Sequence, residues 1–232
     1  MRLTSEQVLT IIRLTLVHLW CMIKGAIMDT KERILYISLD LFAQKGFSGV
    51  SVRDIASAVG VRESALYKHF KNKQDILDSI MVSMKERIEL VYQENEVPEV
   101  VTEDVAQAYK ELSLEKLCEI SWNLFSLFTK DPLVSNYRKL LMREQFGNEQ
   151  AARQYGETYL LGAVHKHSKT FAKLVEGKLF REENPEIIAL QFYGPILLLF
   201  QQYDCNPENE EQIKGYLNEH IRVFGENYSR QV

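Results

Sequence analysis

Apolar residues recur at helical spacing early in the chain and predict a small bundle of helices. A first helix upstream of Gly46 is expected to bury one face, made of Ile34, Ser38, Leu41 and Phe42 at the i, i+4, i+7, i+8 positions. Gly46 follows and is expected to end it. A longer helix is expected after Asn72 and Asp75, which can cap its start. Its apolar side consists of Leu77, Ile80, Met81, Met84, Ile88 and Val91.

Between these two helices the pattern predicts a pair of short helices separated by a glycine. Ser51 can cap the first of them, and Asp54 three residues later completes a capping-box-like pair. Its buried face consists of Ile55, Ala56 and Val59. Gly60 stands where a left-handed residue would stop the helix. A short helix, a turn and a second short helix make a helix-turn-helix, whose second helix lies in the major groove of DNA.

The second short helix divides into an inward and an outward face. Leu66 and Phe70 are four residues apart and are expected to point inward. The outward residues are Glu63, Ser64, Ala65, Tyr67, Lys68 and His69. Glu63, Ser64 and the small Ala65 suit contacts with base edges or a thymine methyl group. The other three suit phosphates, which fix the register without reading sequence.

The predicted DNA contacts extend to neighbouring residues and form a local basic patch. Lys73 is expected to meet a phosphate at the start of the following helix, where free amides and the helix dipole favour an anion. The full set is Ser51, Arg53, Arg62, Glu63, Ser64, Ala65, Tyr67, Lys68, His69 and Lys73. The net charge of −4 does not suggest a protein that coats nucleic acid. A localised basic patch is enough to engage phosphates on one face, with strong salt dependence.

At these residues the chain resembles the tetracycline-repressor (TetR) family of bacterial transcription regulators. The resemblance rests on Ile34-Leu35, Leu41-Phe42, Gly46-Phe47, Val52-Arg53-Asp54-Ile55-Ala56, Gly60-Val61, Ala65-Leu66-Tyr67-Lys68-His69-Phe70 and Lys73. It implies an all-helical homodimer with a DNA-binding domain over residues 28–75 and an effector-binding and dimerisation domain over 76–232. Family members usually repress and leave a palindromic DNA operator when a small hydrophobic ligand binds.

Arg62 departs from the family pattern, which often has Ser or Thr after Gly-Val to cap the recognition helix. An arginine cannot make the same capping hydrogen bond. Two interpretations stand even: Arg62 contacts a phosphate or a guanine edge, or it is a solvated surface arginine.

The second half of the chain also has a helical pattern, without β-alternation or a glycine-rich phosphate loop. The break at Asn95-Glu96-Val97-Pro98 marks the expected domain junction. Helices are expected near residues 102–129, 132–146, 149–178, 185–204 and 207–228. Three of the starts place a capping side chain before a proline, at Asp131-Pro132, Asn184-Pro185 and Asn206-Pro207.

Two features of this half predict roles. The helices near 185–204 and 207–228 are expected to form a four-helix dimer interface, because residues 187–200 are apolar almost all round; burial inside a monomer is the weaker alternative. Gly194-Pro195 is expected to kink the first of these helices.

Aromatic and flexible apolar residues on the middle helices suit the wall of an amphipathic-ligand pocket, although such residues are more often core. The predicted pocket residues are Trp122, Phe125, Tyr137, Met142 and Tyr159.

Catalysis, metal binding and cofactor binding find little support in the sequence. His165 and His167 are two residues apart on a helix and make a poor chelate, and no nucleophile stands beside a plausible base. Three distant cysteines fit neither a disulfide framework nor a zinc site and favour a reducing cytosol, so we expect a cytoplasmic protein.

The first 27 residues are apolar but carry Arg13, His18 and Lys24, and they lack a signal-peptide cleavage site. An assigned start too far upstream and an extra packed helix are the favoured interpretations, ahead of a membrane-surface anchor. The sequence as a whole predicts a ligand-responsive, DNA-binding transcription regulator, a repressor. A helical interaction protein that keeps the fold without an operator is the alternative.

Overall fold

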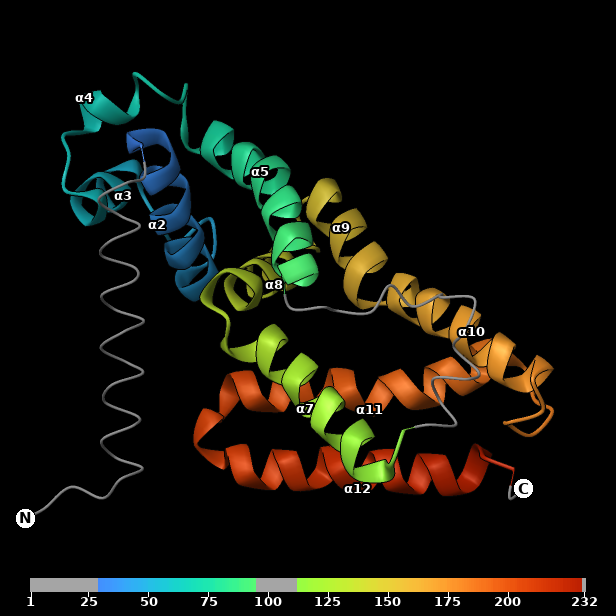
Figure 1. Ribbon diagram of the computed structural model, residues 1–232. Coiled ribbons are helices and arrows are strands. Elements are labelled where there is room, and N and C mark those ends of the chain that lie inside the picture. Colours follow the sequence, from blue (N-terminus) through green and yellow to red (C-terminus); the bar gives the residue numbers. More distant parts are fainter. Residues whose placement is uncertain (1–28, 95–111, 231–232) are drawn as a thin grey trace, which may run out of the picture. The chain divides into compact units, whose positions relative to one another are not determined.

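The computed structural model describes residues 29–94 and 112–230, and within those ranges the regular elements are helices apart from one isolated β-bridge (Figure 1). The predicted all-α fold is confirmed. The chain forms two compact units that divide between Ile80 and Met81. Helix α5, Lys73–Glu94, runs through that division, so the predicted limits of 28–75 and 76–232 remain predictions. The expectations for residues 1–27 and for the junction at 95–98 lie outside the described residues.

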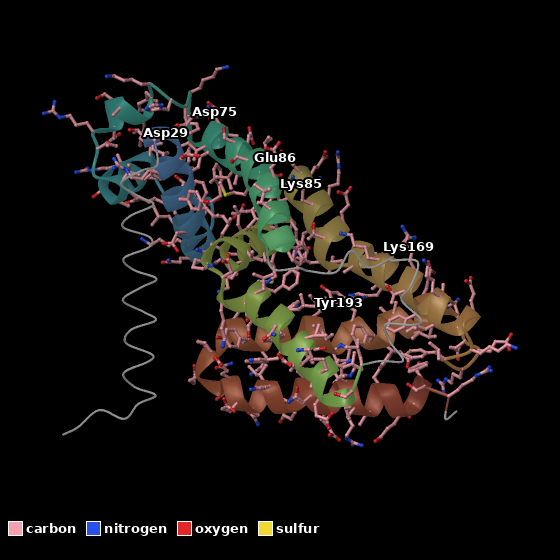
Figure 2. The ribbon with its side chains drawn as sticks, in the orientation of Figure 1. Asp29, Asp75, Lys85, Glu86, Lys169 and Tyr193 are labelled. Carbon is pink, nitrogen blue, oxygen red and sulfur yellow. The ribbon has the colours of Figure 1, made fainter. Side chains whose placement is uncertain are left out.

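The stops at Gly46 and Gly60 and the caps at Ser51 and Asn72 are confirmed. The second short helix, however, ends at Leu66, before the Phe70 that the pattern places on it. The helices of the N-terminal unit are α2 (Thr30–Lys45), α3 (Val52–Val59), α4 (Glu63–Leu66) and the first part of α5. Asp29 caps α2, and Asn72 accepts a hydrogen bond from the Asp75 amide at the start of α5 (Figure 2). Gly46 and Gly60 follow α2 and α3 with φ of 76° and 78°, a region where a side chain would be strained.

The core of the N-terminal unit is formed by aliphatic and aromatic side chains from all four helices. It includes Ile34, Leu35, Leu39, Phe42, Ile55, Val59, Leu66, Phe70, Ile76 and Leu77. Ser38 and Phe42 are buried as predicted, but Leu41 is only partly buried, because the buried face of α2 turns toward Leu35 and Leu39 instead.

Six longer helices follow α5 among the described residues of the C-terminal unit. They are α7 (Leu114–Lys130), α8 (Pro132–Glu144), α9 (Glu149–Tyr159), α10 (Leu161–Glu176), α11 (Pro185–Cys205) and α12 (Glu210–Tyr228). The caps at Asp131 and Asn184 are confirmed, since each accepts hydrogen bonds from amides of the first turn. The cap at Asn206 is wrong: its side chain makes no capping bond, and residues Pro207–Asn209 form a 3-10 turn before α12.

Two helix predictions are wrong in extent. The expected helix over 102–129 is interrupted at residues 112 and 113, because Ser113 caps α7 through the Lys116 amide and α7 begins at Leu114; residues 102–111 of that prediction lie outside the described residues. The expected helix over 149–178 is broken at Leu160, whose φ of −114° and ψ of −122° are not helical. A Cβ at Gly162 would lie 1.9 Å from the Glu157 carbonyl oxygen, so this break requires glycine.

A tyrosine from α11 hydrogen-bonds to the chain at this break. The Ala163 amide donates to the Leu160 carbonyl instead of continuing the helical pattern to Tyr159. The buried hydroxyl of Tyr193 donates to the Tyr159 carbonyl at 3.1 Å. Burial raises the pKa of the Tyr193 hydroxyl well above its usual range, so it keeps the proton that it donates.

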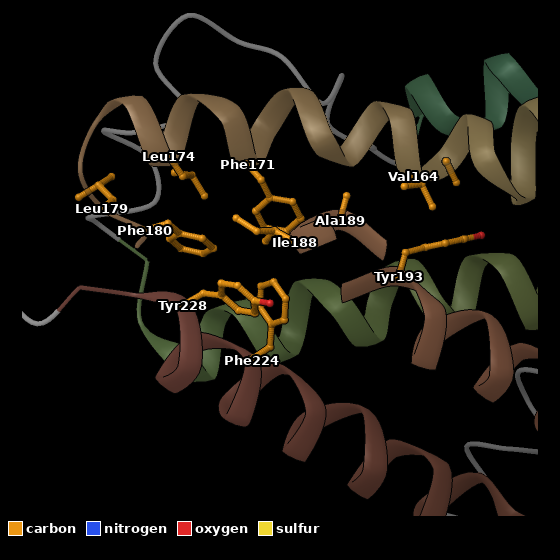
Figure 3. Close-up of a cluster of buried hydrophobic side chains, with 11 residues drawn as sticks. Val164, Phe171, Leu174, Leu179, Phe180, Ile188, Ala189, Tyr193, Phe224 and Tyr228 are labelled. Atoms are coloured by element: carbon orange, nitrogen blue, oxygen red, sulfur yellow. The ribbon is translucent and has the colours of Figure 1, made fainter. Parts of the chain in front are cut away.

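Two clusters of buried apolar side chains hold the C-terminal helices together. The first lies among α10, α11 and α12, where Phe171 and Phe180 pack against Phe224 and Tyr228 (Figure 3). An antiparallel β-bridge between Phe180 and Ser229 joins the end of α12 to the turn after α10. The second cluster joins α7, α11 and α12 through Phe125, Leu199, Phe200, Ile213 and Leu217.

One buried ion pair connects three of these helices. The Arg138 guanidinium on α8 donates to both carboxylate oxygens of Asp204, near the end of α11, at 2.7 and 2.8 Å. Its Nε also donates to the Phe128 carbonyl on α7. Arg138 is 1% exposed and is the one charged side chain that is fully buried among the described residues. Such an arginine is tolerated because its donors are paired.

We expect Tyr193→Phe to lower the free energy of unfolding by about 1–3 kcal/mol, because a buried carbonyl loses a donor while the ring is kept. Urea denaturation followed by circular dichroism measures the difference. Tyr67→Phe is the matched control, since that tyrosine is exposed and its hydroxyl can bond to water. Equal stability of the two variants would show that the Tyr193 bond makes no net contribution.

Candidate nucleic-acid interface

Helix α4 has the two faces that the sequence predicts for a recognition helix. Leu66 and Phe70 are 1% and 3% exposed and anchor the helix and the turn after it in the core. Tyr67 is 54% exposed. Ala65 is half-buried. The other outward residues are exposed, and they are Glu63, Ser64, Lys68 and His69. The arrangement leaves one polar face available to a groove of DNA, although each base or phosphate contact stays a prediction.

Arg62 occupies the N-cap position of α4 with an extended backbone and an exposed side chain. The side chain makes no capping hydrogen bond to the helix, as its chemistry predicts. Its guanidinium is therefore not engaged in capping, and both interpretations of Arg62 stay open.

The Ser51 hydroxyl is engaged within the protein. It accepts a hydrogen bond from the Asp54 amide at 3.1 Å, and the Ser51 amide donates back to the Asp54 carboxylate at 2.8 Å. The predicted capping box is confirmed. Ser51 also donates its hydroxyl proton to that carboxylate, and these bonds hold the pKa of Asp54 below its usual value. Any DNA contact of Ser51 has to compete with these bonds, whereas the neighbouring Arg53 is exposed.

Lys73 lies differently from what its predicted role requires. Its ammonium group donates to the carbonyls of Phe47 and Val50 at 2.8 and 2.7 Å. It also lies 4.2 Å from the centre of the Phe47 ring. Two of its three donors are thus directed at the turn between α2 and α3. The phosphate contact stays a prediction, but the geometry favours a role in holding that turn against the start of α5.

Lys31 and Lys45 are exposed on α2. The other exposed cations of this unit lie on α3, at the start of α4 and just after it, and they are Arg53, Arg62, Lys68 and Lys71. Because these side chains are exposed, they supply the positive field expected beside phosphates.

The predicted pocket residues all lie in the C-terminal unit, and their described contacts are packing contacts or hydrogen bonds. Trp122 stacks on Phe125 at 5.5 Å, and Phe125 stacks on Phe200. Tyr159 packs edge-on against Phe128, and the Tyr137 hydroxyl is hydrogen-bonded. Met142 is half-buried. Their role in ligand binding stays a prediction.

Sequence reasoning missed several residues of the C-terminal unit that make long-range polar contacts. Arg138, Gln154 and Asp204 show no local signal, because their partners are between 10 and 73 residues away in the chain. Among the described residues, no group of three or more His, Cys, Asp or Glu is placed to hold a metal ion. None of the described helices combines the length and the apolar composition needed to cross a bilayer.

The fold and the exposed face of α4 define a helix-turn-helix unit joined to a helical unit. Residues 34–80 match the model of the bacterial regulatory proteins of the tetR family. The match lies within the segment that contains the helix-turn-helix and the first part of α5.

Curated relatives match short stretches of this chain. The HTH-type transcriptional regulator AcrR of Shigella flexneri is 41% identical over 68 residues, which are 28% of this chain and 32% of the relative. The tetracycline repressor protein class C of Escherichia coli is 37% identical over 54 residues, which are 23% and 25% of the two chains. The matches thus span about a third or less of these relatives.

Solved structures share the fold of nearly the whole chain. SmeT, the repressor of the multidrug efflux pump SmeDEF of Stenotrophomonas maltophilia, has a TM-score of 0.59 at 20% identity and covers 88% of this chain and 92% of its own. The regulator FadR of Bacillus subtilis, in complex with stearoyl-CoA, has a TM-score of 0.56 at 21% identity, over 83% and 96% of the chains.

The contacts of Lys73 and the exposure of Lys68 give opposite expectations for two substitutions. Lys73→Met removes two hydrogen bonds to carbonyls, so the free energy of unfolding should fall by about 1–3 kcal/mol. The slope of log K for DNA against log salt should not change. Lys68→Met should leave stability unchanged and reduce that slope by about one, as loss of a phosphate contact does.

Thermal denaturation and DNA titrations at several salt concentrations measure both effects. If Lys73→Met reduced the salt slope by one without loss of stability, Lys73 would be a phosphate contact after all.

Proposed function

We propose that this chain is a ligand-responsive transcription regulator that represses by occupying a DNA operator. The observation that carries the proposal is the α3–α4 geometry: a capped helix, a left-handed glycine and an anchored second helix with an exposed polar face. The match of residues 34–80 to the tetR family supports it. No catalytic role is proposed for any residue.

A small-molecule effector is proposed for the C-terminal unit. SmeT has been solved with triclosan and FadR with stearoyl-CoA, and both share this chain's fold. An amphipathic effector of similar character would suit the aromatic residues Trp122, Phe125, Tyr137 and Tyr159 with Met142. Binding of the effector changes the position of α5. The spacing of the two recognition helices in a dimer then no longer matches the spacing of the two DNA half-sites.

The dimer is proposed to form through α11 and α12, because both helices expose apolar side chains. On α11 these are Ile187, Leu190 and Leu198, and on α12 they are Tyr216 and Val223. Ile187, Leu190, Gly194 and Leu198 are spaced three or four residues apart and follow one stripe of the helix. A symmetric pairing of this surface implies a palindromic operator, with half-sites about 34–36 Å apart.

The first test is binding of the purified protein to a labelled duplex from the region upstream of its gene, followed by selection from random duplexes. We expect sequence-selective binding that Tyr67→Ala weakens and that Ala65→Ser shifts in sequence preference, since Tyr67 is exposed directly after α4 and Ala65 is a small, partly exposed residue of α4. Lys169→Ala, on helix α10 of the C-terminal unit, is the control. Absence of selective binding in both experiments would favour an interaction protein that keeps the fold.

The dimer is tested by Leu198→Arg, which places a charge in the exposed apolar stripe without changing the core. We expect monomers in sedimentation equilibrium, an unchanged helix content and loss of operator binding. Leu161→Arg is the matched control, because Leu161 is also exposed but lies on α10. A dimer that survives Leu198→Arg would place the interface elsewhere.

A further inference from the structure

Two side chains from different helices converge on one backbone carbonyl of α5. The Gln154 amide nitrogen, from α9, donates to the Met81 carbonyl at 3.2 Å. The Tyr137 hydroxyl, from α8, lies 2.6 Å from the Gln154 amide oxygen and 3.3 Å from the same carbonyl. We call these three groups the Met81 network. All three belong to the C-terminal unit.

The single hydroxyl proton of Tyr137 determines how the network is arranged. It goes to the Gln154 oxygen, because that contact is much the shorter of the two. The Gln154 amide is then fixed with its oxygen toward Tyr137 and its nitrogen toward Met81. Burial raises the pKa of the Tyr137 hydroxyl well above its usual range, so the proton stays in place. Tyr137 therefore orients Gln154, and Gln154 contacts α5.

The network differs in kind from the packing around it. Met81 and Met84 of α5 are fully buried, and flexible methionine side chains tolerate small shifts between helices. Hydrogen bonds are lost when the donor and acceptor separate by a few tenths of an ångström or lose their alignment. The polar contacts at Met81 therefore select one position of α5 among those that apolar packing would accept.

The same helix carries the positioning contacts of the DNA-binding unit. Lys73, in the first turn of α5, holds the Phe47 and Val50 carbonyls of the turn that precedes α3. Lys73 and Met81 are eight residues apart, which is about 12 Å along a helix. A change in the position of α5 at Met81 can therefore be transmitted along the helix to Lys73, and through its hydrogen bonds to the turn before the helix-turn-helix.

We propose that Tyr137 and Gln154 are positioning residues for operator binding, which fix α5 through the Met81 carbonyl in the position that lets both recognition helices engage DNA. The inference rests on the proposed function and names the residues through which the C-terminal unit controls it. Without the network α5 samples several positions, and only part of the dimer population is then competent to bind a full operator.

The test compares full-length Tyr137→Phe with wild type on a full operator and on a single half-site. Tyr137→Phe should weaken full-site binding by roughly three- to tenfold, the effect of losing about one hydrogen bond. Half-site binding should not change, because one recognition helix does not depend on the spacing of two. Tyr155→Phe is the matched control, since Tyr155 is a buried tyrosine on α9 outside the network.

Gln154→Glu supplies a second readout that packing alone does not predict. The introduced carboxyl can donate to the Met81 carbonyl only when it is protonated, and burial raises the pKa of such a group. The ratio of the full-site affinity of Gln154→Glu to that of wild type should therefore be near one at about pH 5.5 and fall as the pH rises to about 8. Dividing by the wild-type value removes the pH dependence of the DNA contacts.

Each other outcome overturns the proposal. Unchanged or tighter full-site binding by Tyr137→Phe would mean that the network does not hold the competent position. An equal loss on full and half sites would mean a general structural defect, which thermal denaturation of the same samples would also reveal. If the wild-type protein bound no duplex, the proposed function itself would fail, and that result differs from a wild type that binds and variants that bind equally well.

Discussion

The buried guanidinium of Arg138 is the constraint on which the C-terminal unit depends. Once this charge is buried, it needs every one of its partners, because an unpaired charge in the core costs about 3–5 kcal/mol. Its bonds to Asp204 and to the Phe128 carbonyl fix α8 against α11 and α7. Tyr137 is the preceding residue and points from another side of the same helix to the Met81 network. The ion pair thus sets the position of the helix that contacts α5.

The two units differ in how closely they resemble known proteins, and physical chemistry explains the difference. Residues 34–80 of the N-terminal unit match a family model at the level of sequence; in the proposed function this surface has to fit a groove of constant dimensions, which leaves less freedom for substitution. The C-terminal unit shares its fold with solved regulators at about 20% identity. Its helices only need to bury apolar faces, and many sequences satisfy that requirement.

Local signals predicted most of the N-terminal unit and failed where distant residues decide the structure. The Ser51–Asp54 capping box and the glycines at 46 and 60 involve neighbours within a few residues and are confirmed. The break at Leu160 depends on Gly162 and on Tyr193 from another helix. The helical spacing of apolar residues continues across the break, so the sequence pattern does not reveal it. Lys73 has the family's position, yet its partners at Phe47 and Val50 become visible only in the folded chain.

Helix α4 is a single turn without a side-chain cap, and its order comes from the two anchors Leu66 and Phe70. A helix this short has little intrinsic stability of its own. The exposed residues between and before these anchors therefore contribute little to folding. Mutation can exchange them freely, so in the proposed function the recognised DNA sequence is able to diverge during evolution while the scaffold stays intact.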